Sequence, residues 1–227
     1  MNLFPIGSVA ASSSTASING IDYNLFEPNN GCRSYDQFNN LVTPFENQIL
    51  LTRQKALPML TIEYTYDNIF DREFRQLEHF LYTISSGKLN SFYVVDWSRG
   101  IKPSNIANAS GDWLCSISDT RYFSTTTNYK SYYGLIWSGR EFKIGNVVTL
   151  VANTSITLDI DAFNYGSLSL SNAQAMGILY PVYEVYANVD NLSDFQVGAF
   201  ADDKFAGDKD AGYMRSGNIT FSTKYKV

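Results

Sequence analysis

Few side chains in this 227-residue chain could carry out chemistry. Its single histidine, His79, is the only imidazole available to activate a Ser or Cys nucleophile. It falls on the polar side of a predicted helix, so we interpret it as a solvent-exposed surface residue. Zinc sites need several His or Cys ligands at fixed spacings, and the sequence has no such pattern. We therefore expect no catalytic residue and no metal site.

Carboxylates cluster once, in Asp202–Gly212 (DDKFAGDKDAG). This segment lacks both the spacing of a calcium-binding loop and its closing Glu, so we interpret it as a solvated loop. Gly134 and Gly139 lie between aromatic residues and precede no predicted helix, which argues against a phosphate-binding loop. We expect no cofactor and no enzymatic activity. A pair of carboxylates brought together only in space remains open, and with it a glycoside or peptidoglycan hydrolase.

Aromatic side chains are concentrated in Thr120–Trp137 (TRYFSTTTNYKSYYGLIW). Tyrosine and tryptophan rings can stack on the apolar faces of sugars, which makes this stretch a possible contact for a ligand or partner. The alternative is that the same rings form cross-strand pairs in a core. The candidate contact residues are Tyr122, Tyr132, Tyr133 and Trp137.

The composition favours a mainly-β protein, because aromatics make up 15% of the residues and charged residues only 17%. The formal net charge of −5 disfavours binding to nucleic acid through a basic face on electrostatic grounds. No apolar run approaches the roughly 20 residues that span a membrane, and the N-terminus lacks the pattern of a secretory signal. Whether Cys32 and Cys115 pair is left open.

One amphipathic helix must position much of the fold. Its predicted buried stripe follows a helical spacing and consists of Phe70, Phe74, Leu77, Leu81 and Ile84. Asp67 or Asn68 is the expected N-cap, and Gly87 the expected C-terminal stop. An alternating strand precedes the helix at residues 60–66, and an apolar strand follows it at residues 91–97. Phe92, Val94 and Trp97 should form the surface on which the helix packs.

Short strands follow, and the fold class we expect is mainly β (α+β). A sandwich or split-barrel core with one packed helix would comprise residues 21–100 and 178–227, preceded by a flexible arm at residues 1–20. A small all-β domain would be inserted at residues 101–177. The expected later strands are Trp113–Ser118, Tyr132–Trp137, Asn146–Val151, Ser155–Ile160, Tyr180–Val189 and Ile219–Val227, with a hairpin turn at Asn153–Thr154.

The stretch Thr61–Trp97 (TIEYTYDNIFDREFRQLEHFLYTISSGKLNSFYVVDW) resembles the minor tail or distal tail proteins of long-tailed bacteriophages. The C-terminal GNITFSTKYKV and the preceding YPVYEVY are similar to the end of that family. The likeness covers residues 45–100 and 178–227, about half of the chain. The residues that carry the helix–turn–strand signature are Leu77, Phe80, Gly87, Ser91, Phe92, Asp96 and Trp97.

This resemblance implies a structural protein of the virion, made in the host cytoplasm and placed in the tail tip or baseplate. Several copies, often six, would form a homo-oligomeric ring that joins the tail tube to the hub and fibres. The arm at residues 1–20 would clasp a neighbouring subunit. A carbohydrate-binding β-sandwich module acting in host adhesion is the alternative, and it could coexist with the first interpretation through the insert.

Overall fold

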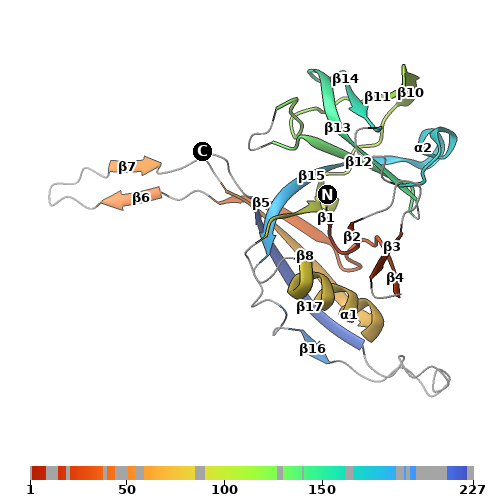
Figure 1. The fold of residues 1–227 in the computed structure, drawn as a ribbon. Helices are drawn as coiled ribbons and strands as arrows, with labels where there is room; N and C mark the ends of the chain where they lie inside the picture. Colours follow the sequence, from red (N-terminus) through yellow and green to blue (C-terminus); the bar gives the residue numbers. More distant parts are fainter. Residues whose placement is uncertain are drawn as a thin grey trace.

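The computed structural model describes residues 2–8, 15–18, 21–37, 40–43, 51–54, 59–84, 90–126, 130–139, 141–161, 166–187, 192, 195–197 and 214–223. One large, almost entirely antiparallel sheet dominates the fold, and the longer of the two described α-helices packs against one end of it (Figure 1). The predicted mainly-β, α+β fold class is confirmed.

Nine strands of the sheet follow one another side by side. In spatial order they are β10 (Asn105–Ala109), β11 (Asp112–Ser116), β14 (Ser155–Asp159), β13 (Phe142–Val151), β12 (Tyr133–Trp137), β15 (Ile178–Ala187), β17 (Met214–Thr223), β8 (Met59–Phe70) and β5 (Cys32–Gln37). Four more strands join this path: β9 (Phe92–Val95), β1 (Asn2–Leu3), β2 (Gly7–Ser8) and β16 (Gln196–Val197). Two hairpins pair separately, β3 (Thr15–Ile18) with β4 (Ile21–Asn24), and β6 (Asn40–Thr43) with β7 (Leu51–Gln54).

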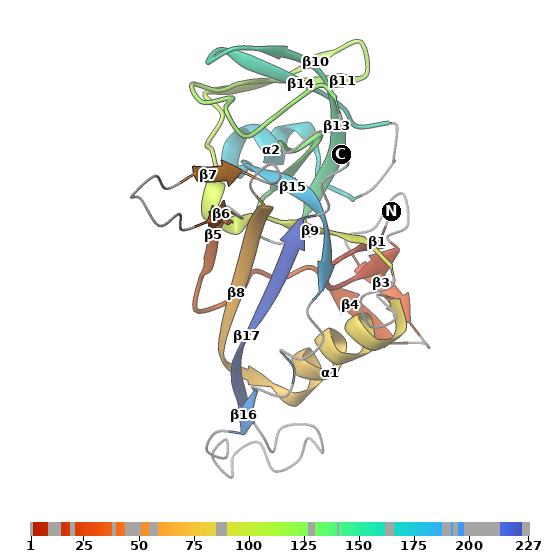
Figure 2. The same ribbon diagram turned by 90° about the vertical axis from the view of Figure 1, so that its left-hand side faces the viewer.

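Strand β15 belongs to both halves of the molecule. Its first residues, Ile178–Val182, pair with β12 of the predicted insert. Its last residues pair with β9 on one side and with β17 on the other. Figure 2 shows β15 running from the insert strands at the top to β8 and β17 below. The region 101–177 is therefore not a separate sheet attached by a linker, because its strands continue the sheet of the core.

The helix begins later than predicted. Helix α1 (Asp71–His79) continues as a π-helical turn, η1 (Phe80–Ile84). Asp67 and Asn68 are not its N-cap, because both still belong to β8, where Asn68 adopts a positive φ of 51°. The backbone N–H of Phe70 instead donates to the Glu73 carboxylate at 3.0 Å, which satisfies one donor at the helix start.

The predicted packing of the helix on the sheet is largely confirmed. Phe74, Leu77 and Leu81 share one buried cluster with Phe92 and Val94. The same cluster contains side chains from the last strand, so the helix covers a sheet that includes both β9 and β17. Burying each large apolar side chain contributes about 1.5–3 kcal/mol before entropy costs.

Three members of the predicted seam differ from the rest. Phe70 is 44% exposed, so its assignment to the buried stripe was wrong. The reason is that Phe70 ends β8 with extended backbone geometry and does not share the helical periodicity. The side chain of Ile84 lies outside the described residues. Trp97 is half-buried, and its ring packs between the helix-bearing cluster and a second cluster.

Residues 2–8 do not behave as part of the flexible arm that we expected over residues 1–20. Leu3, Phe4 and Ile6 are at most 2% exposed, and β1 pairs with both β2 and β9. The Phe4 ring lies 5.1 Å from the Phe80 ring and 5.0 Å from the Phe221 ring. The prediction is therefore wrong for residues 2–8, whose apolar side chains complete the core. Residues 1, 9–14 and 19–20 of the same segment lie outside the described residues.

The insert contains the predicted strands and one helix that the sequence did not reveal. Its hairpin turns where expected, and Asn153 supplies the positive φ, 52°, that glycine would otherwise provide. Helix α2 (Leu170–Met176), whose N-cap Ser169 accepts from the Asn172 N–H, means that the insert is not all-β as predicted. The predicted C-terminal strand is confirmed as far as Thr223, and residues 224–227 lie outside the described residues.

Candidate functional site

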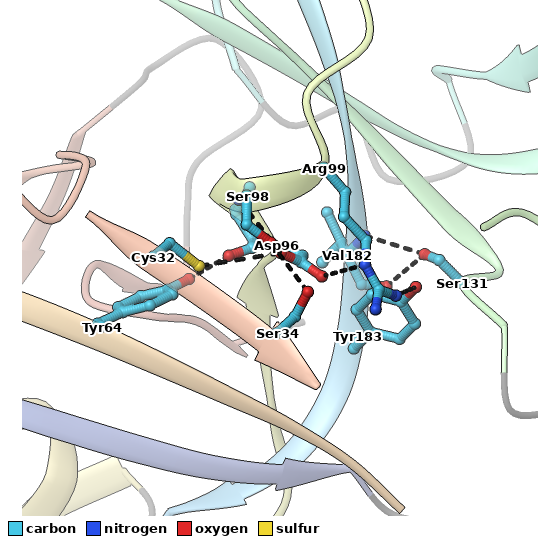
Figure 3. Close-up of polar contacts among 10 residues, drawn as sticks. Cys32, Ser34, Tyr64, Asp96, Ser98, Arg99, Ser131, Val182 and Tyr183 are labelled. Carbon is cyan, nitrogen blue, oxygen red and sulfur yellow. Dashed lines mark hydrogen bonds and ion pairs between the residues drawn. The ribbon is translucent and has the colours of Figure 1, made fainter. Parts of the chain in front are cut away.

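A buried carboxylate lies where the core meets the insert. Asp96, directly after β9, is 0% exposed. Its Oδ1 accepts from the Ser98 backbone N–H at 3.2 Å and from the Ser98 hydroxyl at 2.5 Å. Its Oδ2 lies 3.4 Å from Nε of Arg99 in an ion pair. Figure 3 shows this segment after β9 lying beside Cys32 and Ser34 of β5 and Tyr183 of β15.

Arg99 extends this network towards the insert. Its guanidinium donates to the Tyr183 hydroxyl at 3.4 Å and stacks over the Tyr122 ring, with Cζ 4.6 Å from the ring centroid. Burial lowers the pKa of Arg99, but the charge of Asp96 together with the contacts to Tyr183 and Tyr122 raises it by more, so the guanidinium stays charged. The network therefore neutralises a buried charge and joins elements that are distant in sequence.

The thiol beside this carboxylate is not a nucleophile. Cys32 Sγ donates to Asp96 Oδ1 at 3.8 Å. Burial, with a further contribution from the negative charge of Asp96, raises the pKa of Cys32 to about 12. The thiolate is the reactive form of cysteine, so Cys32 is inert near neutral pH. Both Cys32 and Cys115 are free thiols, which answers the pairing question left open by the sequence.

Two of the four predicted contact residues, Tyr122 and Trp137, pack against other side chains of the protein. Tyr122 is half-buried, with Arg121 on its ring as well as Arg99. Trp137 is only 5% exposed, so its assignment as a surface contact was wrong. Its side chain lies on the face of β12 that N-terminal residues such as Leu3 and Ile6 cover.

The other two predicted residues come together with a third tyrosine. The Tyr133 ring lies 5.0 Å from that of Tyr132 and 5.1 Å from that of Tyr93, both edge to face. Tyr93, Tyr132 and Tyr133, which we call the tyrosine cluster, are all half-buried. Tyr93 was not among the predicted residues, because only the sheet register brings β9 beside β12 across β15.

Polar side chains surround the tyrosine cluster. Glu184 is directly opposite Tyr93 in the β9–β15 register, and it accepts a hydrogen bond from the Ser91 hydroxyl at 2.5 Å. Asn146, opposite Tyr133, donates from Nδ2 to the Tyr132 hydroxyl at 3.2 Å. Burial raises the pKa of Tyr93, and hydrogen bonding to Tyr133 and the charge of Glu184 raise it further. The phenol is therefore protonated and can donate at any physiological pH.

The other features that the sequence singled out as possible chemical groups are His79 and the acidic segment. His79 is half-buried, not fully solvated, and its Nδ1 lies 3.5 Å from the Thr83 hydroxyl. Within the described ranges, no three His, Cys, Asp or Glu side chains converge as metal ligands would. The acidic segment Asp202–Gly212 lies outside the described residues. No helix in the described part of the chain is long and apolar enough to cross a membrane.

Two features offer backbone for contact with another chain. Strand β5 ends the large sheet, and among the described strands it pairs only with β8. Next along the chain, β6 and β7 pair with each other and with no other described strand. In Figure 1 this β6–β7 hairpin extends well away from α1 and from the insert.

Comparison with known proteins places the chain in no family. No protein-family model matches it, and no curated protein matches it.

Proposed function

We propose that this chain is a structural protein of a bacteriophage tail tip, of the distal tail or minor tail kind. The observation that carries the proposal is the shared core of the strand–helix–strand unit and the last strand. Leu77 and Phe92, which belong to the resemblance signature, lie in one buried cluster with Phe221 of the C-terminal segment. The two separate stretches that resemble the family thus form one physical unit.

The β6–β7 hairpin and the neighbouring edge of the sheet support assembly into a larger structure. A two-stranded hairpin on its own is only marginally stable in water, so a surface that receives it would stabilise it. The edge strand β5 carries Tyr35, which is 43% exposed, and Arg33, whose side chain is 73% exposed. Strand edges are common sites of chain-to-chain pairing, and Tyr and Arg are enriched at protein interfaces.

The buried N-terminal residues change which segment we expect to clasp a neighbour. Residues 2–8 are part of the core of their own subunit, so the β6–β7 hairpin takes over the role that we first gave to the N-terminal arm. In the proposed ring, each hairpin contacts the next copy, a head-to-tail arrangement that closes when the rotation between copies permits. The ring would then join the tail tube to the hub and fibres.

The proposal is tested by mass measurement and by location. We expect light scattering after size-exclusion chromatography to give a multiple of the chain mass, and purified phage particles to contain the chain. A variant in which a short glycine–serine turn replaces residues 40–54 should stay folded but lose the oligomer. The matched control is Tyr82→Ala, a 56% exposed residue on the helix side, which should assemble normally. Absence of the chain from purified particles would contradict the proposal.

A further inference from the structure

The tyrosine cluster lies on one face of the sheet, next to the part of that face on which N-terminal side chains pack. Residues that face one another across adjacent strands project from the same side, so Tyr93, Glu184, Tyr133 and Asn146 share a face. Farther along this face Val95 and Leu135 are 0% exposed, because Leu3, Ile6 and Leu25 pack over them. At the cluster the side chains are half-buried and reach solvent, with the exception of the nearly buried Asn146.

Regular strands hold Tyr93, Tyr133 and the polar residues beside them, and Tyr132 directly precedes β12. Tyr93 comes from β9, Glu184 from β15, Tyr133 from β12 and Asn146 from β13. Four adjacent strands of one hydrogen-bonded sheet fix the relative positions of these side chains more firmly than loops would. The edge-to-face contacts at 5.0 and 5.1 Å restrict the rings further. The arrangement is therefore preorganised.

The chemistry of the cluster suits a ligand that has both apolar faces and many hydroxyl groups. Aromatic rings bury C–H faces, while phenol hydroxyls and the Glu184 carboxylate exchange hydrogen bonds with hydroxyls. Glu184 is already oriented by the Ser91 hydroxyl at 2.5 Å. Sugars combine these two properties.

We propose that Tyr93, Tyr132, Tyr133 and Glu184 form a binding site for a neutral carbohydrate. This goes beyond the proposed structural role and does not depend on it. The carboxylate within the cluster and the net charge of −5 disfavour anionic ligands, including acidic sugars and phosphates. The site lies at the boundary between insert and core, and it uses residues of both.

The experiment titrates the full chain with four oligosaccharides by isothermal calorimetry. Cellotetraose, maltotetraose and tetra-N-acetylchitotetraose are the neutral probes, and trigalacturonate is the anionic one. We expect at least one neutral probe to bind at millimolar concentration or below, and trigalacturonate to bind at least tenfold more weakly. Tyr132→Ala should weaken binding about tenfold by removing one ring. Glu184→Gln keeps the size of the side chain and should weaken binding by a similar factor, about tenfold, by removing the charge.

Tyr82→Ala is the matched control, because it removes an exposed tyrosine that lies on the helix side, away from the cluster. It should bind like the unaltered chain, and circular dichroism should show that all variants are folded. The proposal is overturned if no neutral probe binds at millimolar concentration. It is also overturned if Tyr132→Ala and Glu184→Gln bind as tightly as the unaltered chain, or if trigalacturonate binds as well as the neutral probes.

Discussion

Replacement of Leu77 by Ala tests the seam between helix and sheet. Leu77 is 0% exposed in the middle of α1 and lies in the cluster that joins the helix to β8, β9 and β17. Truncating a fully buried leucine costs about 2–5 kcal/mol through lost apolar burial and the cavity left behind. A domain of this size is stable by about 5–15 kcal/mol, so this is a large share of the total. The melting temperature should fall by roughly 5–20 °C.

The assay is urea unfolding followed by tryptophan fluorescence. Trp97 packs against the same cluster, so its emission should report the loss of the seam. The midpoint should move to lower urea while the slope of the transition stays the same, which indicates a change in stability only. The control is Glu78→Ala on the next residue, which is exposed and should change the unfolding free energy by less than about 0.5 kcal/mol.

If Leu77→Ala lowered the unfolding free energy by less than about 1 kcal/mol, the packing described above would be refuted, because truncating a fully buried leucine costs more than this. Leu77→Asp extends the test. It places a charge without a partner in the same seam and should yield no soluble folded protein. If the Leu77→Asp variant were soluble and unfolded cooperatively, that result would also refute the packing of Leu77 in the seam.

Three other predictions concern the buried ionisable groups. Asp96→Asn should lower the unfolding free energy by about 3–5 kcal/mol, because Arg99 loses the carboxylate that neutralises it. The control is Asp119→Asn in an exposed ion pair, which should lower the unfolding free energy by less than about 1 kcal/mol. Similar losses of stability in thermal melts of the two variants would contradict this prediction. Cys32 and Cys115, whose pKa values are raised to about 12 by burial, should resist a thiol reagent at pH 8 until urea unfolds the chain, and rapid labelling of the native chain would show the opposite. Because the pKa values of both thiols in the folded chain exceed the ordinary value of 9.0, the stability that the protonated thiols contribute is complete below pH 9 and is lost as the pH rises towards 12. The melting temperature should therefore fall between pH 9 and pH 12. An unchanged melting temperature over this range would indicate exposed thiols.

The sequence was most informative where burial follows a simple period. The helical spacing of Phe74, Leu77 and Leu81 predicted the packed face of α1 correctly, because one face of a helix is a local property. The same spacing gave a wrong prediction for Phe70, because a periodic pattern does not show at which residue a strand ends and a helix begins. The turn at Asn153 was found without a glycine, because asparagine tolerates the left-handed conformation.

The rest depends on contacts between distant parts of the chain. Leu3, Phe4 and Ile6 are too few to show a periodic pattern, and only their burial against the folded sheet identifies them as core. Tyr132 and Tyr133 were recognised as candidates from composition, but their contact with Tyr93 follows from a register between strands about forty residues apart. The apolar residues LFPI at positions 3–6 are followed by a run of small polar residues, whose composition favours a flexible segment.

The position of β15 has a mechanical consequence. A pull on the insert along this strand reaches the core through a single continuous backbone, not through a hinge. The ladders to β9 and β17 then resist in shear, so their hydrogen bonds share the force and yield together. Tension applied to the insert would thus reach the core with little slack.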